Sequence, residues 1–181
     1  MASKGMRNPF RKVKNIIRES DAIIEVVDAR DIQGTRNQAI EKIAKGKRLV
    51  IAINKSDLIK GKKRPKIKTK FDYIFVSAKK RYGKKKLLEL LTKNTKKAKI
   101  KVGILGYPDV GKSSLINYLK GKKVVKVAFT PGVTKGKQYI RLTDRILLVD
   151  SPGVYPKKER KAGLVLKAAI DAVSYTTSDA A

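Results

Sequence analysis

The sequence contains no cysteine, no histidine and no tryptophan, and 15 Asp and Glu stand against 45 Lys and Arg. Without cysteine, neither a disulfide framework nor a thiolate zinc site can form. Without histidine, the chain lacks the commonest general base of enzymes, and a Ser-His-Asp hydrolase is excluded. These absences narrow the chemistry that the chain can perform.

Long hydrophobic runs are also missing. Residues 1–15 lack the apolar stretch of a secretory signal. No apolar run approaches the roughly 20 residues that a membrane-spanning helix needs. We therefore expect a soluble, cytoplasmic protein without a membrane partner. We also expect it to be a monomer.

The shortage of acidic residues leaves a formal net charge of +30 and a pI near 10.4. Such an excess favours a polyanionic partner, RNA or an RNA–protein particle. Lysine outnumbers arginine, which suits phosphate contact better than planar reading of bases. Basic runs at 60–70, 79–86 and 156–161 are interpreted as a distributed RNA-binding surface. The alternative is a lysine-rich soluble protein whose charged runs are only solvated faces.

Short apolar runs rich in β-branched residues alternate with segments of helical spacing. The apolar runs are residues 22–29, 49–54, 73–78, 100–106 and 146–150. The helical segments are residues 9–20, 36–45 and 84–97 and the stretch after Lys112. Apolar runs of this kind are typical of strands covered by helices on both faces. The pattern predicts an α/β fold with a doubly wound, mostly parallel sheet, to which residues 138–142 add one antiparallel edge strand.

Residues 106–113, Gly-Tyr-Pro-Asp-Val-Gly-Lys-Ser, fit the phosphate-loop pattern GxxxxGK[ST] between a predicted strand and a predicted helix. Backbone N–H groups there can converge on a phosphate at a helix N-terminus. Gly111 permits close approach, Lys112 can reach the β- and γ-phosphate oxygens, and the Ser113 hydroxyl can ligate magnesium. The predicted phosphate-binding residues are Asp109, Val110, Gly111, Lys112, Ser113 and Ser114.

Two segments further along the chain fit the same nucleotide site. Asp150 ends the predicted strand 146–150 and can hold magnesium, and the Gly153 N–H in Asp-Ser-Pro-Gly can contact the γ-phosphate. Thr134, in the intervening loop, is predicted as a second hydroxyl ligand of magnesium, with Thr130 as the alternative. Lys112, Thr134 and Gly153 are the predicted catalytic residues.

The tetrapeptide Asn54-Lys55-Ser56-Asp57, at the end of the predicted strand 49–54, has the form of a guanine-reading loop. The Asp57 carboxylate can accept from both N1–H and the 2-amino group of guanine, a pairing that adenine cannot offer. Asn54 is predicted to brace the loop, and the Lys55 stem to cover the base.

Ser77, Ala78 and Lys79 end the next predicted strand and extend this interpretation. The Ala78 N–H can donate to guanine O6, and the Lys79 stem can flank the ring. The tripeptide means little alone, but here it follows the Asn-Lys-x-Asp loop by one strand.

The guanine loop precedes the phosphate loop here, the reverse of the usual order. In this order the motifs resemble those of the circularly permuted GTPases of the YlqF/YawG type, the nucleostemin-like ribosome-assembly GTPases. Residues 28–37, Asp-Ala-Arg-Asp-Ile-Gln-Gly-Thr-Arg-Asn, are also similar to a stretch of this family. A fold tolerates such rejoining because domain termini lie close together and surface loops accept new connections.

The resemblance implies a GTP-binding, GTP-hydrolysing switch that acts in large-subunit ribosome assembly by binding rRNA or the pre-ribosome. It implies that the chain binds GTP or GDP together with Mg²⁺, and that K⁺ is a further cation. It also implies slow intrinsic hydrolysis of GTP that the ribosomal particle stimulates. Val154 stands where Ras-like enzymes carry a water-orienting Gln. Asp109 replaces the family's potassium-linked Asn, and the catalytic histidine of bacterial relatives is missing.

The expected organisation is a basic helical segment at 1–20, the permuted GTPase domain at 21–174 and a tail at 175–181, without the family's usual C-terminal domain. Two other functions fit the same residues. One is an RNA-binding module with a structural, non-hydrolysing guanine-nucleotide site. The other is an ATP-using phosphotransferase built on the same phosphate loop.

Overall fold

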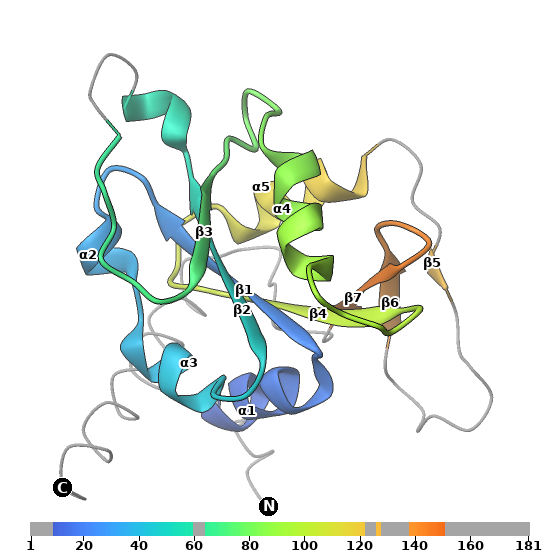
Figure 1. Ribbon diagram of the computed structural model, residues 1–181. Helices are drawn as coiled ribbons and strands as arrows, with labels where there is room; N and C mark the ends of the chain where they lie inside the picture. The colour runs from blue at the N-terminus through green and yellow to red at the C-terminus, as the bar shows by residue number, and fades with distance from the viewer. Residues whose placement is uncertain (1–8, 60–63, 122–125, 128–137, 151–181) are drawn as a thin grey trace, which may run out of the picture.

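The computed structural model describes residues 9–59, 64–121, 126–127 and 138–150. Its strands form one sheet in the order β3-β2-β1-β4-β7-β6-β5 (Figure 1). They are β1 (Ala22–Asp28), β2 (Arg48–Asn54), β3 (Asp72–Phe75), β4 (Ile100–Leu105), β5 (Lys126–Val127), β6 (Gln138–Arg141) and β7 (Ile146–Asp150). The first five in this order are parallel, while β6 is antiparallel to both β7 and β5.

The predicted fold class, a mostly parallel α/β sheet, is confirmed. Residues 138–141 form the expected antiparallel partner of β7, with Gln138 opposite Asp150. However, β6 is not the edge of the sheet, because the two-residue strand β5 pairs with its outer side. A strand this short has no periodicity to detect in the sequence, so only the pairing reveals it.

Helices occur at the four predicted segments within the described residues, with different lengths, and two short helices, α2 and η1, were not predicted. They are α1 (Pro9–Glu19), α2 (Ile32–Thr35), α3 (Gln38–Ile43), α4 (Lys84–Thr92), α5 (Lys112–Lys120) and the 3₁₀-helix η1 (Ser56–Ile59). The segment expected at 36–45 starts at Gln38 because the Asn37 side chain caps it, accepting from the Ala39 and Ile40 N–H groups. The segment expected to reach Lys97 stops at Thr92, where Asn94 adopts a left-handed φ of 60° that ends the helix.

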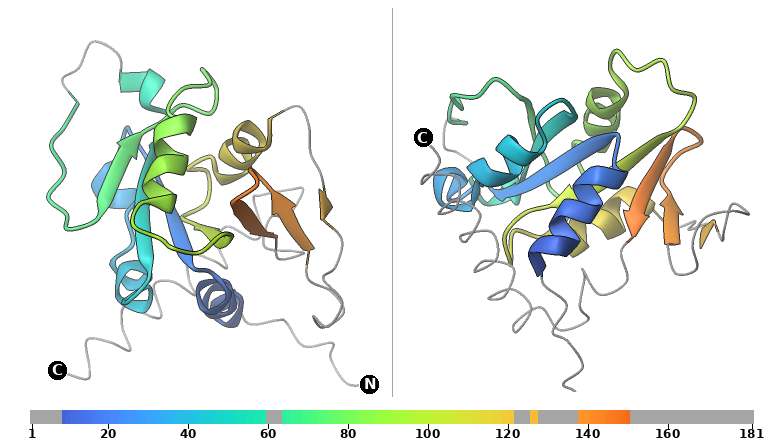
Figure 2. Two further views of the ribbon diagram at one scale, coloured as in Figure 1. Left: turned by 45° about the vertical axis from the view of Figure 1, so that its right-hand side comes forward. Right: turned by 90° about the horizontal axis from the view of Figure 1, so that it is seen from below.

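Helices cover both faces of the sheet (Figure 2). Helices α1, α2 and α3 pack on one face, where Ile23 and Val27 of β1 are buried. Helices α4 and α5 pack on the other face, against Ile24 and Val26 of the same strand. Alternate residues of β1 therefore enter two separate cores, and this explains why the strand is apolar on both sides.

The topology positions the predicted motifs. Going outward from the β1–β4 pair, the strand order runs to β2 and β3 on one side and to β7 on the other. In open α/β sheets, ligands bind outside the carboxyl ends of the strands at such a switch point. The guanine-loop residues follow β2, and the phosphate loop follows β4. None of the helices in the described ranges is long and apolar enough to cross a membrane.

Candidate functional site

Asn54 ties three predicted motifs together at the carboxyl edge of the sheet. Its Nδ2 donates to the backbone carbonyls of Val110, at 3.0 Å, and Gly111, at 3.4 Å. Its Oδ1 accepts from the Ala78 N–H at 3.2 Å. Asn54 is only 2% exposed, so these bonds are shielded from water. One side chain thus joins the guanine loop, the Ser-Ala-Lys loop and the phosphate loop.

The phosphate loop has the backbone that its sequence predicts. Gly111 has φ 90°, and a Cβ there would lie 2.4 Å from Asn54 Nδ2. Asp109 has φ 60°, a left-handed conformation that aspartate and asparagine tolerate better than most residues. Lys112 opens α5, is 8% exposed, and donates through Nζ to the Tyr107 carbonyl at 2.5 Å. Its ammonium therefore lies along the loop, near a helix N-terminus suited to phosphate.

Lys55 connects the guanine loop to the phosphate loop from a strained backbone position. Its φ is 60°, and its Nζ donates to the Asp109 carbonyl. The same Nζ forms an ion pair with Asp28 Oδ2 at 2.9 Å. Lys55 is held by two anchors, so its side chain is fixed between the Asp109 carbonyl and Asp28.

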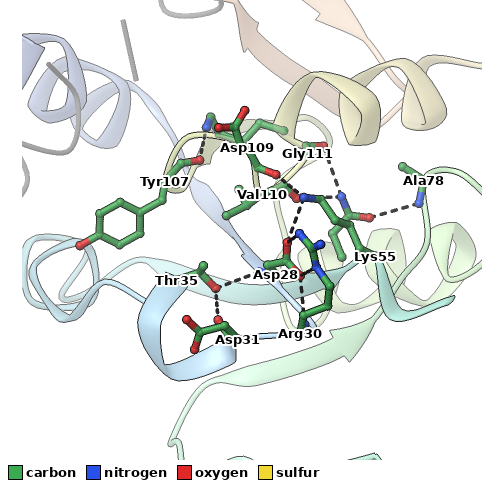
Figure 3. Close-up of polar contacts among 12 residues, drawn as sticks. Asp28, Arg30, Asp31, Thr35, Lys55, Ala78, Tyr107, Asp109, Val110 and Gly111 are labelled. Carbon is green, nitrogen blue, oxygen red and sulfur yellow. Dashed lines mark hydrogen bonds and ion pairs between the residues drawn. The ribbon is translucent and has the colours of Figure 1, made fainter. Parts of the chain in front are cut away.

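Asp28, at the end of β1, is the fixed charge of this site. Burial raises the pKa of its carboxyl, but hydrogen bonds from the Arg30 side chain and backbone and from Lys55 outweigh burial and hold that pKa well below its usual value. Asp28 therefore stays ionised and keeps Lys55 in place. Figure 3 shows Asp28 between Arg30 and Lys55.

Asp57 lies in η1, partly exposed at the rim of the site. Ser77 Oγ donates to Asp57 Oδ1 at 2.5 Å and accepts from the Lys80 N–H at 2.9 Å. The Ser77 hydroxyl, itself held by the Lys80 N–H, thus holds one oxygen of the Asp57 carboxylate in place. Lys79, predicted to flank the ring, is exposed.

The Ala78 N–H, predicted to donate to guanine O6, is donated to Asn54 Oδ1 in this structure. The sequence did not indicate that partner. This hydrogen bond holds the Ala78 amide against the Asn54 side chain, which also contacts the phosphate loop.

The predicted magnesium ligands are described only in part. Ser113 lies in the first turn of α5, and Ser114 follows it, exposed. Asp150 ends β7 at the carboxyl edge of the sheet, next to β4. Thr134, its alternative Thr130, Gly153 and Val154 lie outside the described residues. A serine hydroxyl is the hard oxygen donor that Mg²⁺ prefers, and nucleotide phosphates and water can complete its six ligands.

A buried network behind the phosphate loop was not predicted. Glu25 lies inside β1, 0% exposed, and its Oε1 accepts from the Asn37 N–H at 2.6 Å. Asn37 Nδ2 donates to the Tyr107 hydroxyl at 2.9 Å, which reaches the phosphate loop. Burial raises the pKa of Glu25 to about 8. An acidic residue inside an otherwise apolar strand was the signal that could have revealed this network.

The functional role of Asp28 was not predicted from the sequence, in which it is the first residue of the family-like segment 28–37. Its role could have been inferred from position, since it ends the strand paired in parallel with β2, and its backbone partner is Asn54. Carboxyl ends of neighbouring parallel strands meet at one edge of the sheet.

Comparison with known proteins gives results in agreement with this geometry. Residues 101–179 match the family model described as 50S ribosome-binding GTPase. An uncharacterised GTP-binding protein of Methanocaldococcus jannaschii is 46% identical over 83% of this chain and 43% of its own length. Nuclear/nucleolar GTPase 2 of Arabidopsis thaliana is 43% identical over 94% of this chain and 32% of its own length. The chain therefore spans less than half the length of these relatives.

Solved structures support the fold. GDP-bound YlqF aligns with a TM-score of 0.54 and 25% identity, covering 82% of this chain and 60% of that one. GNP-bound YlqF from T. maritima aligns with a TM-score of 0.52 and 27% identity.

The expected cytoplasmic localisation is wrong. The Arabidopsis relative is named for the nucleus and nucleolus, and the Saccharomyces cerevisiae relative is named nucleolar GTP-binding protein 2. These names point to the nucleolus and away from the cytoplasm.

A guanine loop that precedes its phosphate loop in the sequence, yet is bonded to it in the fold, agrees with what the comparisons found. The chain belongs to the circularly permuted GTPases of the YlqF/YawG type.

Proposed function

We propose that this chain is the GTP-binding and GTP-hydrolysing switch of a factor for large-subunit ribosome assembly. The observation that carries the proposal is the set of Asn54 bonds. They join a guanine loop to a phosphate loop at the switch point of the sheet.

Recognition of guanine rests on Asp57, whose carboxylate accepts from N1–H and the 2-amino group. Ser77 holds that carboxylate in orientation, and the Lys55 stem, fixed by Asp28, covers one face of the base. The backbone amide of Ala78 lies where guanine O6 enters, and Asn54 braces all three loops. This arrangement penalises adenine because the Asp57 carboxylate would face a base edge that lacks the matching pair of donors.

Hydrolysis relies on positioning and charge neutralisation, with water as the acceptor. Lys112 turns from the Tyr107 carbonyl to the β- and γ-phosphate oxygens, and backbone N–H groups of residues 109–113 surround the β-phosphate. Ser113, with Thr134 and Asp150, is proposed to hold Mg²⁺, which neutralises charge on the phosphate oxygens when bound. The Gly153 N–H is proposed to contact the γ-phosphate. Because Val154 cannot orient water, we propose slow intrinsic hydrolysis that the ribosomal particle and K⁺ stimulate.

The proposed partners are the large ribosomal subunit or its precursor and its rRNA. The family model's description and the names of the nucleolar relatives support this partner class. A net charge of +30 also favours a polyanionic particle. We propose that the chain binds it as a monomer.

The test is titration of the chain with fluorescently labelled GDP and ADP, in which the fluorescence of the nucleotide reports binding. We expect strong preference for GDP, and loss of that preference in Asp57→Asn. Asp144→Asn is the matched control, because Asp144 is exposed in the β6–β7 turn and far from the site in the fold. Equal affinities for GDP and ADP in the unmodified chain would overturn the proposal. Single-turnover hydrolysis with and without large subunits then separates a switch from a non-hydrolysing module.

A further inference from the structure

A groove of about 680 Å³ lies between α3 and the segment that leads into β3, away from the predicted nucleotide residues. Its basic lining residues are Arg36, Lys42, Lys45, Lys47, Lys68 and Lys70. Glu41 is the one carboxylate among the groove's lining residues. Figure 1 shows the segment before β3 passing alongside α2 and α3.

Arg36 holds the two walls of the groove together. Its Nε donates to Glu41 Oε1 on α3 at 2.7 Å. Its other two nitrogens donate to the Lys68 carbonyl and to Thr69 Oγ1, both at 3.1 Å. We call this set of hydrogen bonds the Arg36 staple. The Arg36 and Glu41 side chains are only 13% and 14% exposed, so the staple is sheltered from solvent. Hydrogen bonds between its two walls therefore hold the groove in shape.

The staple leaves the groove positively charged. Glu41 is neutralised by Arg36, while Lys47 Nζ donates to the carbonyls of Arg18 and Ser20. Lys42, Lys45, Lys68 and Lys70 are exposed. In the part of the chain that the structure describes, none of these four forms an ion pair with a carboxylate. Like charges gathered without counter-charges favour an anionic ligand.

We propose that this groove binds the sugar–phosphate backbone of RNA. The Arg36 guanidinium already donates to both walls of the groove. It is therefore not available for the bidentate hydrogen bonds by which arginine recognises a base edge or a phosphorylated side chain. The remaining lysines are point charges suited to phosphates in succession. The volume exceeds that of one phosphate group and accommodates a stretch of backbone. The proposal rests on the proposed function, because it assigns a surface to the RNA partner.

The test compares two triple variants that lose the same charge. Lys42→Ala, Lys45→Ala and Lys68→Ala remove groove lysines. Lys93→Ala, Lys96→Ala and Lys99→Ala remove exposed lysines from the connection between α4 and β4. The probes are fluorescein-labelled duplex RNA of mixed sequence and polyuridylate, titrated with the full chain by fluorescence anisotropy from about 50 to about 200 mM salt.

We expect the groove variant to bind both RNAs on the order of tenfold more weakly, and its log–log salt slope to fall by about two to three. The control variant should lose markedly less, and both should keep the GDP affinity of the unmodified chain. Equal losses in the two variants would overturn the proposal, because they would reflect net charge alone.

Unaltered RNA binding by the groove variant would also overturn the proposal, while leaving the GTPase function standing. Loss of binding to large ribosomal subunits with naked RNA binding retained would assign the groove to a protein, against the proposal. Failure of the unmodified chain to bind GDP would instead strike the proposed function.

Discussion

Glu25 and Asp28 show how far the position of a residue decides its chemistry. Both carboxyls belong to β1, yet burial raises the pKa of Glu25, while hydrogen bonds from Arg30 and Lys55 outweigh burial at Asp28 and lower its pKa. Glu25 receives one backbone N–H, and its second oxygen has no hydrogen-bond partner among the described residues. Asp28 receives charged donors at the edge of the sheet. The first favours a neutral acid, and the second a permanent anion.

Asp28→Asn should weaken GDP binding about tenfold, since one charge-assisted hydrogen bond to Lys55 is lost. Isothermal titration with GDP measures the change. Asp31→Asn is the matched control, because asparagine also caps a helix N-terminus and Asp31 caps α2. A GDP affinity of Asp28→Asn equal to that of the unmodified chain would show that Lys55 is positioned without Asp28.

From the raised pKa of Glu25 we predict that the free energy of unfolding falls as pH rises. Its pKa is about 8 in the folded chain against 4.5 for an ordinary glutamate, so the folded state binds the proton more tightly. The stabilisation is fully present below the unfolded pKa of 4.5 and is lost progressively as pH rises to the folded pKa of about 8, by at most about 1.4 kcal/mol per pH unit.

Glu25→Gln should remove this pH dependence, because glutamine is neutral at every pH in the range. Urea unfolding of both chains at about pH 6 and about pH 8 tests it. Parallel losses of stability in the two chains would mean that another group titrates.

At the scale of elements, α1 lies on the sheet with unusually little clearance. Val13, Ile16 and Ile17 of α1 are buried against the face formed by β1, β2 and β4. A Cβ added at Gly103 of β4 would lie 2.6 Å from Ser20 Oγ and 2.7 Å from Ile16 Cγ2. The absent side chain at Gly103 is therefore what lets the helix and the strand approach so closely.

Gly103→Ala should destabilise the fold by about 1 to 3 kcal/mol, through overpacking between α1 and β4. Urea denaturation measures the loss. Combined with Ser20→Ala, which removes the nearest atom, the double variant should lose less than the sum of the single losses. Strict additivity would argue that the strain does not arise at this contact.

Across the whole molecule, the net charge of +30 acts on every element at once. Self-repulsion destabilises a compact state, and salt screens it. The melting temperature should therefore rise by several degrees between about 10 and about 150 mM salt. Equal effects of NaCl and KCl would identify screening as the cause. A melting temperature that falls with salt would mean that attractive ion pairs dominate.

Much of the fold could be read from local patterns. Each buried strand is a short run that carries its own signal, so β1, β2, β4 and β7 lie where the sequence predicts them. The two-residue β5 carries no such signal, and the early end of α4 depends on one backbone angle at Asn94.

The candidate site was predicted as separate motifs and not as an arrangement. The bond from Asn54 to the Val110 carbonyl joins residues 56 positions apart, and the Arg36 staple reaches 33 positions along the chain to Thr69. Such pairings depend on which strands become neighbours, which no local pattern encodes.

By itself, the sequence determined the chemistry available to this protein: a phosphate loop, a guanine loop, no histidine or cysteine, and a large positive charge. Those properties belong to residue types and their spacing, and they survive a change in the order of motifs. Only the tertiary structure decided that Asp28 fixes Lys55, that Glu25 supports Asn37, and that Arg36 builds a basic groove. These roles come from burial and from contacts between distant segments, which exist only once the sheet has brought its strands together.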